Sequence, residues 1–290
     1  MRVTRNILAG MGLWLTAAMP GVALAQPAPQ PDKSQYTLFN PVPDALMRDF
    51  STDRPPKANS PNTIDAGHFE YETDLVNFAR LQTGSTRTDT LLAPNPTFKL
   101  GLTNSIDLEV NAPTVVGIHT FDSTAGLSST MWGIGDVYVR TKVNLWGNDG
   151  GQSALALIPY VKAPTAPVGI GNGAVEGGVI APLSFTLPQG FTLLFNSEVD
   201  ALKNSTDDGR HTNFMTLVNV SHELVKTVTL YVEFWSDTNN DPVQRTTQYS
   251  ADFAVTWLAR PNLQLDAGID VGLNSMTPKV QVFAGLSQRF

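Results

Sequence analysis

A period-two alternation of apolar and polar residues, sustained from Gly67 to the last residue, is the feature that most limits how this chain can fold. In the stretch IDLEV, for example, Ile106 and Leu108 alternate with Asp107 and Glu109. Because successive side chains of a strand point to opposite faces, each such segment predicts one apolar and one polar face. Roughly twelve segments of about ten residues follow this pattern, which is the length of a tilted strand that crosses a membrane.

The connections between these segments alternate strictly between short and long. The short ones are TNS, GNDG, PQG, ELVK and RPN, and the long ones are LQTGSTRTD, GIHTFDSTAGLSSTMWG, APTAPVGIGNG, KNSTDDGRH, SDTNNDPVQ and a briefer NSMTP. Short turns on one side and long loops on the other are typical of outer-membrane barrels. The sequence therefore predicts an all-β fold, an up-and-down antiparallel transmembrane β-barrel of about 12 strands.

The final segment, Lys279–Phe290, explains why the chain needs no long apolar stretch. Val282, Ala284 and Leu286 share a face with the terminal Phe290, and alternate apolar residues are sufficient for a strand that faces lipid. Such an ending is similar to the assembly signal of bacterial outer-membrane barrels, so we expect Phe290 to be recognised by the barrel-assembly machinery. Closure of the sheet would satisfy every backbone group, as lipid surroundings require.

The first residues have the pattern of an export signal. Arg2 and Arg5 precede the apolar stretch ILAGMGLWLTAAM, and the sequence ALA, which ends at Ala25, supplies small residues at the A-x-A spacing. We therefore expect a signal peptide over residues 1–25 and the outer membrane of a Gram-negative bacterium as the destination. The chain has no cysteine and a net charge of -7, which exclude thiol chemistry and argue against a nucleic-acid partner.

Residues 26–65 differ from the alternating region because they are dense in Pro, Asp and Asn and show no sustained period. We expect a proline-rich leader and then an N-terminal segment that plugs the barrel or lies beneath it in the periplasm, with residues 66–290 forming the barrel. In DFSTDRP, Asp53 and Arg54 are candidates for contacts inside the lumen, since an arginine can hold a carboxylate through two parallel hydrogen bonds. The alternative is a capped turn before the first strand.

Several motifs match one bacterial family. They are STDRP, SP and AGHF leading into Glu70 and Glu72, and, in the strand regions, LGLTNSIDLEV, GIGDVYVRTKVNL, VEGGVIAPLSFTLP and LQLDAGIDVGL. On these motifs the sequence resembles the outer-membrane transporter family named for the meta-cleavage pathway of phenol degradation. The resemblance implies a β-barrel with a channel role, often associated with aromatic compounds, and it does not specify the substrate.

The same alternation sorts the charged residues onto the water-facing side of the predicted barrel. They could form a selectivity surface, because rings of side-chain charge bias permeation. Alternatively, they could pair with one another and merely keep the interior wet. The candidates for lining the lumen are Glu70, Glu72, Asp74, Lys99, Asp107, Glu109, Asp136, Arg140, Lys142 and Glu176.

The hairpin around the TNS turn allows a specific prediction of register. A three-residue loop would pair Leu102 with Ile106 and place Lys99 opposite Glu109 on the water-facing side. A one-residue slip would put charges into lipid, at about 2–4 kcal/mol for a lysine at the midplane, so the register should be firmly set. We expect the pair itself to contribute only about 0.2–1 kcal/mol, because a wet lumen would screen it.

The sequence carries no catalytic signature such as G-x-S-x-G or a phosphate loop. Ser221 and His222 are neighbours on a predicted strand and point to opposite faces, which prevents them from acting as nucleophile and base of an outer-membrane esterase or phospholipase. We therefore predict no enzyme, cofactor or metal, but a channel for passive uptake of small molecules, aromatic or hydrophobic ones among them. Its expected partners are outer-membrane lipid, the assembly machinery and the small-molecule permeant. The main alternative is a non-conducting structural or interaction barrel.

Overall fold

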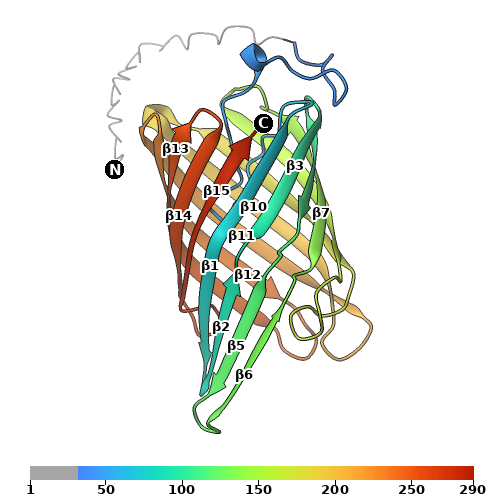
Figure 1. Ribbon diagram of the computed structural model, residues 1–290, viewed down its shortest axis with the longest axis vertical. Coiled ribbons are helices and arrows are strands. Elements are labelled where there is room, and N and C mark those ends of the chain that lie inside the picture. Colours follow the sequence, from blue (N-terminus) through green and yellow to red (C-terminus); the bar gives the residue numbers. More distant parts are fainter. Residues whose placement is uncertain (1–31) are drawn as a thin grey trace, which may run out of the picture.

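A computed structural model describes residues 32–290 as one antiparallel sheet of 15 strands, which closes on itself because β15 pairs with β1. Figure 1 shows the barrel from the side. The predicted signal peptide and the first part of the leader lie outside the described residues. Single-turn 3-10 helices occur at Asp44–Leu46 and Pro188–Gly190. The strands are β1 (Phe69–Thr83), β2 (Thr86–Leu92), β3 (Asn95–Thr103), β4 (Ile106–Asn111), β5 (Val116–Asp122), β6 (Leu127–Gly133), β7 (Val137–Trp146), β8 (Ser153–Ala163), β9 (Glu176–Thr186), β10 (Phe191–Lys203), β11 (Arg210–Val225), β12 (Val228–Asn239), β13 (Thr246–Arg260), β14 (Leu263–Gly272) and β15 (Val280–Arg289).

Three pairs of strands each occupy a single position in the barrel wall. β1 pairs with β3 along its first half and with β2 along its second half, so β2 and β3 stand end to end. In the same way, β4 and β5 stand end to end, and so do β6 and β7. Pro94 and Pro113 lie in two of the interruptions, where a residue without an N–H cannot continue the ladder. The 15 strands therefore form the 12-strand barrel that the alternation predicts.

The predicted loops LQTGSTRTD and GIHTFDSTAGLSSTMWG are mostly strand, so the loop prediction was wrong in this part of the chain. β1 runs to Thr83, β2 begins at Thr86, and β5 and β6 pair as a hairpin over residues 116–133. Serine and threonine occupy both faces of this hairpin, which hides the period-two pattern. In Figure 1, the β1–β2 and β5–β6 hairpins extend beyond the other strands at the end that carries the long loops.

The register of the β3–β4 hairpin confirms most of its prediction. Lys99 lies opposite Glu109, as expected. The ladder shifts next to the turn, so Ile106 pairs with Thr103 instead of Leu102. The irregularity adds one residue on the β3 side without moving the charged positions to the other face.

Inner and outer faces of the wall differ sharply in polarity. On β11 and β12, the outward side chains of Val218, Val220 and Val232 are exposed, whereas the inward Asn219 and Glu233 are buried. Exposed valines in alternate positions are what a lipid-facing strand requires. Within residues 32–290 no helix is long and apolar enough to cross a membrane, and this finding has no bearing on spanning strands.

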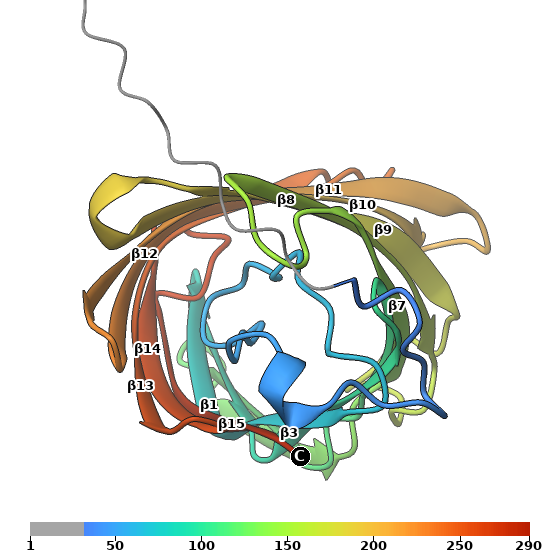
Figure 2. The same cartoon turned by 90° about the horizontal axis from the view of Figure 1, so that it is seen from above.

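Residues 48–66, here called the lumen segment, enter the barrel from its short-turn end and return to it (Figure 2). The return is fixed where the Val42 N–H donates to the Ala66 carbonyl at 3.0 Å. Gly67 then has a φ of 80°, and a Cβ at this position would overlap Pro41. Glycine is therefore required at the point where the chain passes from the lumen into β1.

Candidate functional site in the barrel lumen

Asp53 is the centre of the attachment between the lumen segment and the barrel wall. Its carboxylate accepts hydrogen bonds from Lys99 at 2.5 Å and from Lys142 at 2.9 Å. Both lysine side chains are only 2% exposed. Burial alone would raise the pKa of Asp53, but the two lysines outweigh it and hold that pKa well below its ordinary value. The carboxylate therefore stays ionised and ties β3 and β7 to the segment.

Arg54 ties the segment to a second part of the wall. Its guanidinium donates two hydrogen bonds to Asp266 on β14, at 2.6 and 3.0 Å, and one to Asp74 on β1 at 2.7 Å. Gly285 of β15 leaves room for this group, because a Cβ at that position would collide with the Arg54 guanidinium. The guanidinium therefore holds the Asp266 carboxylate through two parallel hydrogen bonds.

Lys57 makes the third attachment. Its ammonium group lies 2.7 Å from Asp252 on β13 and 2.6 Å from Asp270 on β14. It also sits 5.3 Å from the centre of the Trp235 ring. The next residue, Ala58, packs on Met215 and Leu217 of β11. The lumen segment therefore spans from the charged wall to a smaller apolar patch on the opposite wall.

The predicted lumen-lining residues all lie on the inner side of the wall or at its rim. Asp136 precedes β7 and pairs with Lys162 at 3.2 Å, and Lys162 also pairs with Glu176 at 2.6 Å. Arg140 lies beside the ring of Tyr138 at 5.6 Å. The following predicted residues are buried in the lumen: Glu70, Glu72, Asp74, Lys99, Asp107, Glu109, Lys142 and Glu176.

The partners of these residues differ from the predicted ones. The Lys99 ammonium bonds to Asp53 and Glu72, each at 2.5 Å, and Glu109 pairs with Lys142 at 3.2 Å. Lys99 is also almost completely buried, so the expected screening by a wet lumen does not apply to it. Sequence reasoning missed Lys57 as a lumen residue, although it follows Asp53 and Arg54 in the same charged stretch.

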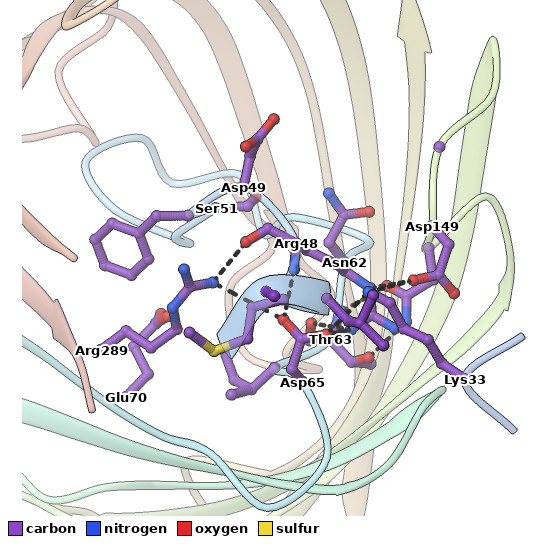
Figure 3. A pocket seen from close by; sticks show the side chains of 17 residues that line it. Lys33, Arg48, Asp49, Ser51, Asn62, Thr63, Asp65, Glu70, Asp149 and Arg289 are labelled. Atoms are coloured by element: carbon purple, nitrogen blue, oxygen red, sulfur yellow. Dashed lines mark hydrogen bonds and ion pairs between the residues drawn. The ribbon is translucent and has the colours of Figure 1, made fainter. Parts of the chain in front are cut away.

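At the short-turn end, the two ends of the lumen segment border a cavity of about 540 Å³ (Figure 3). Arg48 donates to Asp149 at 2.9 Å and to the Asn104 carbonyl at 2.7 Å, which fastens the segment to two short turns. Asp65 pairs with Lys33 at 3.3 Å. Burial would raise the pKa of Asp149, but hydrogen bonds from Asn104 and Arg48 outweigh it and lower that pKa.

Ser221 and His222 do not assemble into a catalytic pair. Ser221 borders a second cavity, of about 270 Å³, between the lumen segment and β9–β12. His222 instead stacks on Phe191 with the ring centres 4.1 Å apart, on the other face of β11. In the part of the chain that the structure describes, no three His, Asp or Glu side chains are grouped to hold a metal ion.

The closed 12-strand wall and its charged lumen define the fold class of outer-membrane β-barrel channels. The chain belongs to the family described as "Putative MetA-pathway of phenol degradation", whose model matches residues 52–290. A search of curated proteins finds no match.

Among solved structures, the chain is similar to the COG4313 outer membrane channel from Pseudomonas putida F1, with 12% identity and a TM-score of 0.61. That match covers 77% of this chain and 93% of the channel. Pseudomonas putida OprB in its low-pH structure is matched at 11% identity over 77% of this chain and 91% of that one, with a TM-score of 0.42. The first of these matches establishes a shared fold.

Proposed function

We infer that the protein is a channel of the bacterial outer membrane for passive uptake of small molecules. The observation that carries this inference is a closed barrel whose lumen holds a segment fastened by ion pairs, with cavities of about 540 and 270 Å³ beside it. In the outer membrane, the short turns face the periplasm and the long loops face the outside of the cell. Lipid surrounds the apolar outer face, and Phe290 at the end of β15 is our proposed assembly signal.

Aromatic or hydrophobic permeants fit one wall of the lumen better than the other. The inner faces of β8, β9 and β11 carry buried Ala156, Ile158, Ile180 and Leu217, whereas the opposite wall carries the paired charges. A molecule that is mostly apolar would move along the first wall with little desolvation of polar groups. The family description, which refers to phenol degradation, supports the same class.

The ion-paired residues have a different role in this proposal. Asp53 and Arg54 hold the lumen segment, and the lysines and carboxylates around them set how far the segment fills the barrel. Residues 26–65 then form a leader and plug, and residues 66–290 form the channel wall, after removal of the signal peptide over residues 1–25. A barrel of about eight strands is only wide enough for side chains to fill its interior. A barrel of 12 strands is wider, so a segment that fills part of its lumen is expected.

Liposome swelling with purified protein tests uptake directly. Both sets of liposomes are loaded with the same impermeant solute. We expect those that contain the protein to admit phenyl glucoside, an aromatic that lipid bilayers exclude, faster than the protein-free ones. Glucose should enter more slowly than an aromatic of similar volume. Equal rates with and without protein would contradict the channel function, and preference for glucose would contradict only the permeant class.

The structure also gives one specific reason to consider a non-conducting barrel. Three charged positions of the lumen segment, Asp53, Arg54 and Lys57, all bind the wall at distances below 3 Å, so the segment could remain in place permanently. Deletion of residues 48–66 distinguishes the two functions. A purely structural barrel conducts only after this deletion, whereas a channel conducts before it as well.

A further inference from the structure

A third cavity, of about 570 Å³, lies at the long-loop end of the barrel, away from the lumen segment. Loops after β10 and β12 and the start of β9 enclose it, and the buried His211 of β11 is among its lining residues. The His211 side chain is only 6% exposed. Its Nε2 is buried and has no hydrogen-bond partner in the described residues, so one residue of the cavity lining carries an unsatisfied polar atom.

The neighbours of His211 determine what this atom can bind. Its Nδ1 lies 3.0 Å from Oδ1 of Asn204, and the Asn204 amide nitrogen donates to Asp207 at 2.7 Å, which fixes the orientation of the amide. Nδ1 must therefore carry the proton and donate to Asn204. In the neutral ring Nε2 is then an acceptor, and it requires a donor from a molecule in the cavity.

The charges around the cavity favour a positive donor. Glu176 and Asp241 belong to its lining, and Asp241 lies 3.7 Å from the His211 ring. The ammonium group of Lys203, which also borders the cavity, pairs with Asp208 at 3.4 Å, where Asp208 is fully exposed. Lys162 is held by Asp136 and Glu176. The two lysines near this cavity are thus already paired with carboxylates.

The next row of inward residues adds unneutralised carboxylates. Asn213 donates to Asp200 at 3.1 Å and to Asp237 at 2.7 Å, and the Tyr160 hydroxyl donates to Asp200 at 2.7 Å. Neither aspartate has an ion-pair partner within residues 32–290. Asp200 and Asp237 are here called the acidic cluster.

From this arrangement we propose that the outer mouth of the barrel is a binding site for small organic cations with N–H donors, such as primary ammonium compounds. The ammonium group donates to Nε2 of His211, and the acidic cluster beneath supplies the attraction that leads it into the lumen. This inference goes beyond the proposed function, and rests on it, by adding small organic cations to the aromatic or hydrophobic permeants that the apolar wall favours.

Binding can be measured without conduction. Protein labelled with 15N-histidine in detergent is titrated with n-butylammonium, tetramethylammonium and butyrate. We expect n-butylammonium to shift the Nε2 resonance of His211, and tetramethylammonium, which has no N–H, to bind about tenfold more weakly, as the loss of one hydrogen bond to a charged group predicts. Butyrate should not bind.

Variants separate the two contributions. His211→Phe should weaken n-butylammonium about tenfold and leave tetramethylammonium unchanged, since only the hydrogen bond is lost. Asp200→Asn combined with Asp237→Asn should weaken both cations by the same factor. Asp44→Asn, a single charge change on an exposed residue at the short-turn end of the barrel, should alter neither. A compact band in unboiled detergent gels confirms that each variant is folded.

The outcomes also distinguish this inference from the proposed function. An unmoved His211 resonance, or butyrate binding as tight as n-butylammonium binding, would overturn the cation site even if the protein conducts. Binding of n-butylammonium by a protein that does not admit solutes into liposomes would support the site and refute the channel.

Discussion

The lumen contains two groups of carboxylates with opposite surroundings. Around the lumen segment, Asp53 and Asp266 are bonded to lysine or arginine at 3.0 Å or less. In the acidic cluster, Asp200 and Asp237 receive hydrogen bonds from neutral amide and hydroxyl groups instead. The comparison shows that the same residue type fastens a segment of irregular chain in one region and is held only by neutral donors in the other.

The largest effect is expected for Asp53→Ala, which leaves Lys99 and Lys142 buried without their shared partner. Breaking a buried ion pair from one side costs about 3–5 kcal/mol, and the cost should appear as detachment of the lumen segment. Hydrogen exchange of residues 48–66 should accelerate while the β-strands remain protected. Asp44→Asn, an exposed change just before the segment, is the matched control. Unchanged exchange in Asp53→Ala would show that the ion pairs do not hold the segment.

A smaller loss is expected for Arg54→Lys. A lysine keeps the charge but cannot bond Asp266 through two parallel hydrogen bonds while also reaching Asp74. The expected cost is about 1.5–3 kcal/mol, the value of a hydrogen bond to a charged group. Proteolysis of the lumen segment in detergent should report it, with Arg87→Lys on β2, at the long-loop end of the barrel, as the control. Equal protection in both variants would contradict a specific role for the guanidinium geometry.

The pH dependence of attachment follows from the lowered pKa values of Asp53 and Asp149. Their ionised forms favour the attached state, so their contribution is complete above the ordinary aspartate pKa of about 3.9 and is lost as the pH falls through the lower, attached-state values. Exchange of residues 48–66, corrected for its intrinsic pH dependence, should therefore stay constant from about pH 8 to 5 and increase only in stronger acid. Asp149→Asn, which removes one titrating group, should reduce the acid-induced change. Detachment already near neutral pH would contradict this assignment.

The smallest effect on stability should come from Asp200→Asn, although it also removes an aspartate from the same lumen. Removing this charge relieves repulsion within the acidic cluster, and asparagine can still accept the Tyr160 hydrogen bond but not the one from Asn213 as well. We expect the free energy of unfolding to fall by about 0.5–1.5 kcal/mol, the value of one hydrogen bond. A loss as large as that of Asp53→Ala, measured by urea unfolding in detergent, would remove the distinction between the two regions.

The wall of the barrel was predictable from the sequence because period-two alternation reports directly which face meets lipid. The pairing of Lys99 opposite Glu109 could be derived from the turn and the alternation alone, since the two residues are close in the chain. The β5–β6 hairpin was missed because serine and threonine occupy both of its faces.

The partners inside the lumen could not be predicted in the same way. Lys99 bonds to Asp53, which lies 46 positions earlier in a segment without a period. Lys57 reaches Asp270 across a sequence separation of 213. Such contacts depend on how the lumen segment folds back into the closed barrel, and no local pattern encodes that path. His211 gave no signal either. Neither its unsatisfied Nε2 nor the Asn204 amide that fixes which ring nitrogen carries the proton can be recognised from the sequence.

The central claim, that a segment held by Asp53 limits an otherwise continuous lumen, is tested most directly by single-channel conductance in planar bilayers. We expect small, uniform current steps for the natural protein and for Asp44→Asn, and steps several-fold larger for Asp53→Ala. Identical steps for all three proteins, or no current from Asp53→Ala, would contradict the claim.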